Sequence, residues 1–298
     1  MTGVRGSQRN RTAVAGALLT GLFLVLAAIA PLIAPGDPLR IGTHPLYPPS
    51  WSFIFGTDDL GRDVLKELIH GARTSLFVGF LAAGTAGLIG VLVGGVAGYC
   101  GGLVDEVLMR LTEFIQVLPR FFLALVGVTL FGPSLESIIL IIGLTAWPLT
   151  ARLFRGDVLR LREREYVVAS RALGARDGRL LVRVILPNAL PPVIAQVSLQ
   201  VGTAILIEAG LAFLGLGDPT VVSWGAMLYN GQRFMRQAWW LAAFPGLALS
   251  LVVSGINLLG DGLSAAWNPR LRQGWGPGTV PWQGLLTVAA RKHDHLGS

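Results

Sequence analysis

The sequence predicts an all-α integral membrane protein with six transmembrane helices. Its 298 residues are 52% hydrophobic and only 14% charged, with a mean hydropathy of +0.61, whereas a soluble domain of this size carries roughly a quarter charged residues. Six weakly charged stretches approach or exceed the length of about 20 apolar residues that a helix needs to cross a bilayer. The distribution of Lys and Arg between these stretches also alternates, as it does in multi-pass membrane proteins.

In chain order, the predicted spans are Thr12–Gly36, Thr74–Val104, Leu108–Phe131, Ser137–Phe154, Pro191–Leu214 and Gln237–Gly260. The fourth is the shortest, because only 15 uncharged residues separate Glu136 from Arg152, and it is therefore extended to Phe154. The first stretch follows a basic start and could be a signal peptide. Its apolar run exceeds the 7–15 residues of a signal core, so we interpret it as an uncleaved helix.

The charge distribution predicts that both chain ends are cytoplasmic. With residues 1–11 inside, 17 of the 24 Lys and Arg residues fall on the cytoplasmic side, which is the bias expected of inner-membrane proteins. This bias explains the net charge of +7 without a nucleic-acid partner. The tail, residues 273–298, is rich in Gly, Pro and Trp and contains no long periodic run, so it is predicted to be cytoplasmic and either disordered or at the membrane interface.

The external segment, residues 35–73, begins with Pro and Gly and then becomes periodic. From Leu60 the apolar residues fall on one side of a helix, which predicts an amphipathic helix lying on the outer membrane surface. Its charges are interpreted as a solvated face, and they are Asp58, Asp59, Arg62, Asp63 and Lys66.

The second span carries small residues at strict four-residue intervals, which lets another helix backbone approach closely in lipid. Ordinary packing within the bundle is the favoured role, and a tight, sliding contact with a neighbouring helix or subunit is the alternative. The stripe comprises Ala82, Ala86, Gly90, Gly94, Gly98 and Gly102.

The third and fifth spans supply candidate residues for a translocation path. Arg120 lies deep in a predicted span, where a cation is costly unless it faces water, carbonyls or a carboxylate. It either lines the path or forms a structural pair with Glu113 or Glu208, and the pair is favoured. Gln196, Gln200 and Thr203 share one helix face and either line the path or hydrogen-bond between helices.

Motifs for covalent chemistry are absent from the sequence. It contains no GxxxxGK[ST], HExxH or GxSxG pattern and a single cysteine, Cys100, so neither a nucleotide-binding P-loop nor a cysteine metal cluster can be assembled. We therefore expect no enzyme activity, no cofactor and no metal site.

The inside loop at residues 155–190 is long, basic and helix-forming. Glu165 to Leu173 predicts a short helix, Gly174 a break, and Asp177 to Val184 a second short helix that ends before Pro187. The result would be a helix–turn–helix knob that projects from the membrane.

This loop resembles the cytoplasmic EAA loop of bacterial ABC importer permeases. The family pattern is Glu-Ala-Ala, three residues, Gly, nine residues, Ile, any residue, Leu-Pro. This loop matches the pattern with Val168 in place of the leading Glu, and Glu165 lies one turn earlier. The resemblance implies that the ATPase-coupling residues are Glu165, Val168, Ala169, Ser170, Gly174, Ala175, Asp177, Leu186 and Pro187.

Other segments, among them FGTDDLGRDVLKELIHGARTSL and NLLGDGLSAAWNPRLR, are similar to the C-type permeases of dipeptide, oligopeptide and nickel importers. The similarity covers roughly Ala13 to Arg272 and implies a type I ABC importer permease fold, with a transmembrane domain at 12–272 and its core at 74–267. It also implies a second, B-type permease, two cytoplasmic ATPase subunits that hydrolyse ATP, and an extracytoplasmic solute-binding protein.

The implied function is the import of peptides or a related small solute by alternating access in a bacterial or archaeal inner membrane. A nickel or glutathione importer of the same family is one alternative. An ATP-independent channel or secondary transporter is another, although neither would need a docking knob.

Overall fold

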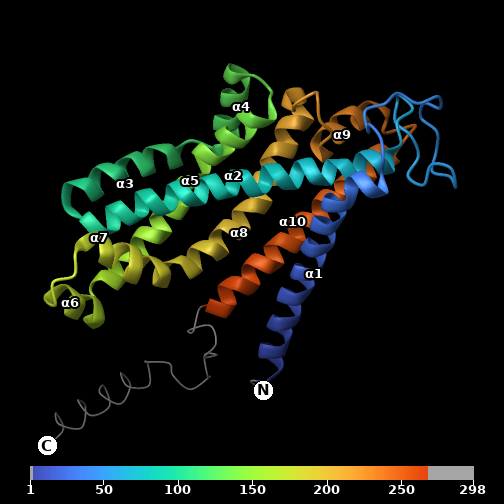
Figure 1. Cartoon of the computed structure of the whole chain (residues 1–298). Coiled ribbons are helices and arrows are strands. Elements are labelled where there is room, and N and C mark those ends of the chain that lie inside the picture. Colours follow the sequence, from blue (N-terminus) through green and yellow to red (C-terminus); the bar gives the residue numbers. More distant parts are fainter. Residues whose placement is uncertain (1–2, 268–298) are drawn as a thin grey trace, which may run out of the picture.

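The computed structural model describes residues 3–267, and the tail prediction for 273–298 lies outside them. The described part is a helical bundle (Figure 1). Its α-helices are α1 (Gly3–Ile33), α2 (Val64–Cys100), α3 (Gly102–Val117), α4 (Arg120–Phe131), α5 (Leu135–Arg162), α6 (Glu165–Ala172), α7 (Asp177–Leu180), α8 (Leu186–Leu211), α9 (Trp224–Gly231) and α10 (Trp240–Trp267), joined in places by the short turns η1 (Leu181–Ile185), η2 (Ala212–Leu216) and η3 (Gln232–Phe234).

The predicted class of an all-α membrane protein is confirmed. Five helical runs of the described chain are long and apolar enough to cross a membrane, and α3 with α4 would make a sixth if the bent pair is one span. The α6 and α7 helices lie at one end of the bundle, called here the loop end. The segment 34–63 and α9 lie at the other, called the opposite end (Figure 1).

The third predicted span is not the continuous helix that the sequence suggested. α3 and α4 meet at an angle of 85°, because Pro119 lacks an amide hydrogen and forces Leu118 out of the helical region. Leu118 is extended, with ψ of 131°. The axial depth of Arg120 therefore cannot be measured along a straight helix from Arg110.

The small residues of α2 pack against α5 of the same chain. A Cβ placed on Gly90 would lie 2.5 Å from the Cβ of Thr150, and one on Gly98 would lie 2.9 Å from the Arg155 carbonyl oxygen. Glycine is required at these positions because the two backbones are in contact. The structure thus places this part of the stripe in an internal helix–helix interface, as expected for small residues in membrane bundles. Gly102 is the exception, because it begins α3, is exposed and has no atom within 4 Å of an added Cβ.

The prediction of a separate surface helix after Leu60 is wrong. The helix begins at Val64 and continues without a break to Cys100 as α2 itself, and Asp63 caps it by accepting a hydrogen bond from the Leu65 amide at 3.0 Å. Some of the charged side chains that were predicted to be solvated are instead buried. Asp58 is only 4% exposed, and Arg62 Nη1 lies 3.7 Å from the carboxylate of the buried Glu67.

The segment 34–63 has no helix of its own and is fastened by buried hydrogen bonds. The fully buried Thr57 hydroxyl donates to the His44 carbonyl at 2.5 Å and accepts from the Tyr47 amide at 2.8 Å. The indole Nε1 of Trp240, on α10, donates to the Thr57 carbonyl at 3.2 Å. Burial raises the pKa of Asp58, against the opposing effect of hydrogen bonds from the Arg62 and Leu60 amides.

Candidate functional site

The loop between α5 and α8 contains the first predicted helix and the predicted break. α6 covers Glu165–Ala172, within one residue of the expectation. Gly174 follows with φ of +86°, a left-handed conformation that glycine adopts without a steric penalty. The Ala175 amide then donates to the Ser170 carbonyl at 3.1 Å, which closes the end of α6.

The expected second helix does not end before Pro187. α7 passes through the π-turn η1 directly into α8, so that one helical run extends over Asp177–Leu216. Pro187 lies in the first turn of α8, where its missing amide hydrogen and its ring are accommodated beside the π-turn. The loop is therefore continuous with a membrane helix on its C-terminal side.

Three apolar side chains anchor the loop to the bundle. Val167, Leu180 and Ile185 are at most 1% exposed. Val167 and Ile185 belong to one buried cluster whose other members are Phe154, Val158, Leu161, Ala189 and Val193. The loop is thus packed on the ends of both α5 and α8, and a displacement of the loop would be transmitted to both helices.

A second attachment joins the loop to the C-terminal end of α2. The Tyr99 hydroxyl donates to Asp177 Oδ1 at 2.5 Å, and Arg171 Nε lies 4.0 Å from the same oxygen. A surface hollow of about 440 Å³ lies beside this contact and is lined by Tyr99, Arg162, Glu163, Val168 and Arg171. Sequence reasoning missed Tyr99, although a tyrosine at the end of an apolar stretch is a common interfacial signal.

The outer surface of the loop is exposed and mixes apolar with basic side chains. Leu173 is 89% exposed and Val168 52%. The predicted coupling residues lie mostly on this surface: Ser170, Ala175 and Leu186 are half-buried, and the exposed ones are Glu165, Val168, Ala169, Gly174, Asp177 and Pro187. The predicted coupling residues therefore lie mostly on the side of the loop that does not pack on the bundle.

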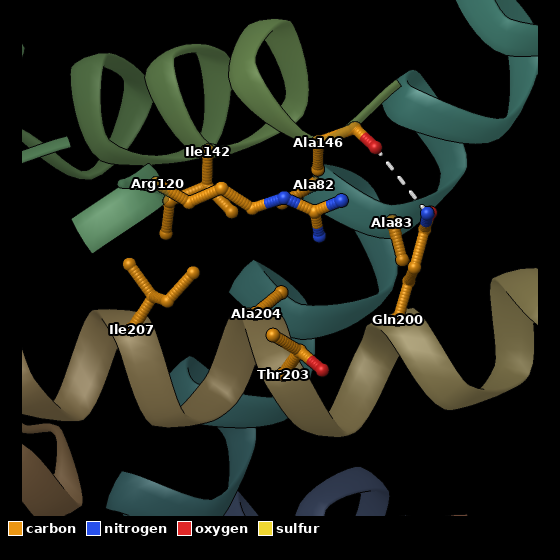
Figure 2. A pocket seen from close by; sticks show the side chains of 9 residues that line it. All are labelled: Ala82, Ala83, Arg120, Ile142, Ala146, Gln200, Thr203, Ala204 and Ile207. Carbon is orange, nitrogen blue, oxygen red and sulfur yellow. Dashed lines mark hydrogen bonds between the residues drawn. The ribbon is translucent and has the colours of Figure 1, made fainter. Parts of the chain in front are cut away.

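A second polar feature lies inside the bundle, between α2, α4, α5 and α8. Figure 2 shows the side chain of Arg120, the first residue of α4, extending toward the alanines of the neighbouring helices. The cavity volume is about 10 Å³, close to the space that one water molecule needs. It is lined by Ala82, Ala83, Arg120, Ile142, Ala146, Gln200, Thr203, Ala204 and Ile207.

The structure brings three of the four predicted path residues together in this cavity. Arg120, Gln200 and Thr203 line it, whereas Gln196 does not. Gln200 is 4% exposed, and its amide nitrogen donates to the Ala146 carbonyl at 3.3 Å (Figure 2). The same nitrogen donates to Thr150 Oγ1 at 3.1 Å. Its Oε1 has no hydrogen-bond partner.

The favoured structural pair for Arg120 is wrong. Glu113 instead lies 3.4 Å from Arg110, and the buried Glu208 accepts a hydrogen bond from Ser75 at 3.4 Å. The 85° bend at Pro119 separates the faces that a straight helix would have aligned. The guanidinium of Arg120 has no ion pair or hydrogen bond among residues 3–267.

Comparison with known proteins places these features in a family. Residues 90–273 match the family model described as "Binding-protein-dependent transport system inner membrane component". The chain is 44% identical to the dipeptide transport system permease protein DppC of Escherichia coli strain K12, over 89% of this chain and 91% of that protein. It is 40% identical to the di/tripeptide transport system permease protein DppC of Pseudomonas aeruginosa, over 88% and 89%.

The fold also has a solved counterpart. A chain of the MetNI methionine ABC transporter, in an inward-facing crystal form, superposes with a TM-score of 0.55 at 20% sequence identity, covering 68% of this chain and 96% of that one. At this identity the likeness concerns the fold, which is that of an ABC importer permease. The matched segment includes the α5–α8 loop and most of the core, and the chain therefore belongs to the binding-protein-dependent transport system inner membrane component family.

Proposed function

We propose that this chain is one transmembrane half of an ATP-driven importer for peptides, completed by a second permease, two ATPase subunits and a solute-binding protein. The peptide assignment is supported by the relatives, which are dipeptide and di/tripeptide permeases at 40–44% identity over nearly their whole length. In this proposal the loop end faces the cytoplasm, in agreement with the excess of Lys and Arg there, and ATP is hydrolysed in the partner subunits.

The single observation that carries the proposal is the construction of the loop. Its outer surface exposes Leu173 and Val168, while Val167 and Ile185 bind its inner surface to α5 and α8. A protein that docks on the outer surface can therefore displace two membrane helices together. An ATPase that opens and closes would convert this displacement into alternating access by rigid-body motion.

Asp177 would hold the loop in register with α2 during this motion, because it accepts a hydrogen bond from Tyr99. Arg162 adds a second link, since its Nη1 donates to the Gly98 carbonyl at 3.1 Å. The three helices α2, α5 and α8 thus meet at the loop, and the proposed coupling passes through all of them.

Co-purification tests the proposed assembly. The tagged chain is extracted from its native membrane in mild detergent, and the bound proteins are identified by mass spectrometry. We expect a second permease and P-loop ATPases. Isolation of the chain alone, under conditions that preserve other ABC complexes, would favour an ATP-independent channel or carrier.

A charge reversal tests the coupling role of the loop. Asp177→Arg removes the acceptor for Tyr99 and places a cation beside Arg171, whereas Asp37→Arg changes an exposed carboxylate at the opposite end. In proteoliposomes that hold the whole complex, we expect Asp177→Arg to insert normally and to lose ATP-dependent uptake, and Asp37→Arg to keep it. Unchanged uptake by Asp177→Arg would refute the coupling role.

A further inference from the structure

The Arg120 guanidinium has a charge that the described part of the chain does not neutralise. It lies at the first position of α4, where the positive end of the helix dipole disfavours a cation. An arginine within a membrane span is tolerated when it faces water or an anion, and the carboxylates of Glu113 and Glu208 have other partners. Among residues 3–267 no carboxylate pairs with Arg120, so its partner is water or an anion supplied from elsewhere.

The surroundings of Arg120 provide space and a second polar group. Four alanines from α2, α5 and α8 line the cavity together with Ile142 and Ile207, so that small side chains make up much of its wall. Gln200 lies at the same cavity with an unpartnered Oε1, although its amide nitrogen is bonded to α5. A buried acceptor without a donor costs free energy, and this cost is removed when a ligand supplies an N–H group.

We propose that this cavity is the intramembrane binding site for the carboxylate end of the transported solute. Arg120 binds the carboxylate through charge-assisted hydrogen bonds, and Gln200 Oε1 accepts an N–H from the neighbouring amide or ammonium group. The inference rests on the proposed importer function and deepens it, because it defines the chemistry of the solute. A peptide C-terminus or a free amino acid carries both groups within a few ångströms.

The same charge excludes part of the substrate range. An unneutralised guanidinium in the path repels a bare divalent cation, so a nickel importer is disfavoured. The cavity as observed holds about one water molecule, so the binding of a carboxylate requires the cavity to widen. Because Arg120 belongs to α4 and Gln200 to α8, the site opens and closes with the helix motion proposed above.

A comparison of two probes tests the site in the whole complex. Proteoliposomes with both permeases, the ATPases and the binding protein are supplied with L-alanyl-L-alanine or with its C-terminal amide, which lacks the carboxylate. For each probe, uptake by an Arg120→Gln complex is divided by uptake of the unsubstituted complex. The preference of the binding protein cancels in this ratio. We expect a loss of about tenfold for the peptide and less than about twofold for the amide.

Three further variants make the result specific. Arg120→Lys keeps the cation for assembly but loses the two-pronged geometry, and we expect it to lose about threefold for the peptide. Gln200→Leu removes the acceptor and should reduce uptake of both probes, since both carry the N–H. Arg110→Gln is the matched control, because Arg110 is exposed and ion-paired on α3, and it should leave both rates unchanged.

The outcomes separate the site from the importer assignment. Equal losses for the peptide and its amide with Arg120→Gln would overturn the site alone, and would indicate that Arg120 pairs with a carboxylate of the partner permease. If the unsubstituted complex showed no ATP-driven uptake of either probe, the importer assignment would fall and the site with it.

Discussion

At the opposite end of the bundle, the segment 34–63 is fastened by buried hydrogen bonds from Thr57 and Trp240. At the loop end, α6 and α7 leave most of their surface exposed. They are held by buried apolar side chains of the loop and by one exposed hydrogen bond, from Tyr99 to Asp177. Hydrogen bonds fix direction as well as distance, whereas apolar contacts constrain packing without a single required geometry.

The difference indicates two mechanical roles. The opposite end is built to keep one shape on α2 and α10. The loop end exposes the surface on which we propose that a partner docks, and its buried side chains pack on α5 and α8.

The largest effect is expected at the exposed apex of the loop. Leu173→Glu places a charge where we propose that an ATPase docks, and should abolish ATPase co-purification while membrane insertion stays normal. Ile41→Glu is the control, because Ile41 is 69% exposed but lies at the opposite end. Retention of the ATPases by Leu173→Glu, or their loss with Ile41→Glu, would contradict the assignment of the two ends.

The second effect is expected in the hydrogen-bonded segment. Thr57→Val leaves the His44 carbonyl and the Tyr47 amide without their partner, at a cost of about 2–4 kcal/mol. Limited proteolysis should then cleave within 34–63 faster than in the unsubstituted chain. Thr43→Val, at an exposed position of the same segment, should have no effect. Equal cleavage of both variants would show that the segment is not fastened through Thr57.

A matched pair of glycines sharpens the prediction for the loop. Gly174 has φ of +86°, whereas Gly178 lies in α7 without a positive φ, and neither has an atom within 4 Å of an added Cβ. Gly174→Ala should therefore destabilise the turn by about 1–2 kcal/mol, and Gly178→Ala should be neutral or slightly stabilising. Hydrogen exchange across α6 measures the difference, and equal protection in the two variants would exclude strain at Gly174.

The smallest effect is expected at Asp218, which links η2 to the start of α5. Burial opposes ionisation, but hydrogen bonds from Thr220 and from the Leu135 amide lower the pKa of Asp218 below its usual value. Because the folded pKa is the lower one, the stabilisation is present above the unfolded pKa and is lost as the pH falls through the folded value.

Asp218→Asn should therefore cost about 1 kcal/mol at neutral pH and nothing at a pH below the folded pKa. Thermal unfolding in detergent at both pH values checks this. An equal cost at both pH values would show that the charge of Asp218 does not contribute.

Much of the fold could be predicted, since composition and Gly174 act locally, and the break at Gly174 needs no tertiary information. The bend at Pro119 also has a local cause, but the third span was predicted as one continuous helix. The errors arose where tertiary contacts decide. The charges around Arg62 were interpreted as solvated. In the structure, Arg62 instead lies beside Asp58 and beside Glu67 on the first turns of α2, and the three side chains form one largely buried network.

The interior cavity could be predicted only in part. The spacing of Gln200 and Thr203 placed them on one face, but the direction of Arg120 depends on the 85° bend, whose angle no local pattern specifies. Tyr99 was missed because its partner, Asp177, is 78 residues away in the sequence. How the coupling residues bind a partner stays a prediction.

The unbroken α2 helix also fixes the distance between the loop end and the opposite end. Its 37 residues extend about 55 Å at 1.5 Å per residue, well beyond an apolar layer of about 30 Å. Its first turns contact the fastened segment through Glu67, and its last turn contacts the loop through Tyr99. Insertion of one residue at its middle would rotate one end by about 100° against the other. The number of residues in α2 is therefore constrained by the contacts at both of its ends, in addition to the glycines that pack on α5.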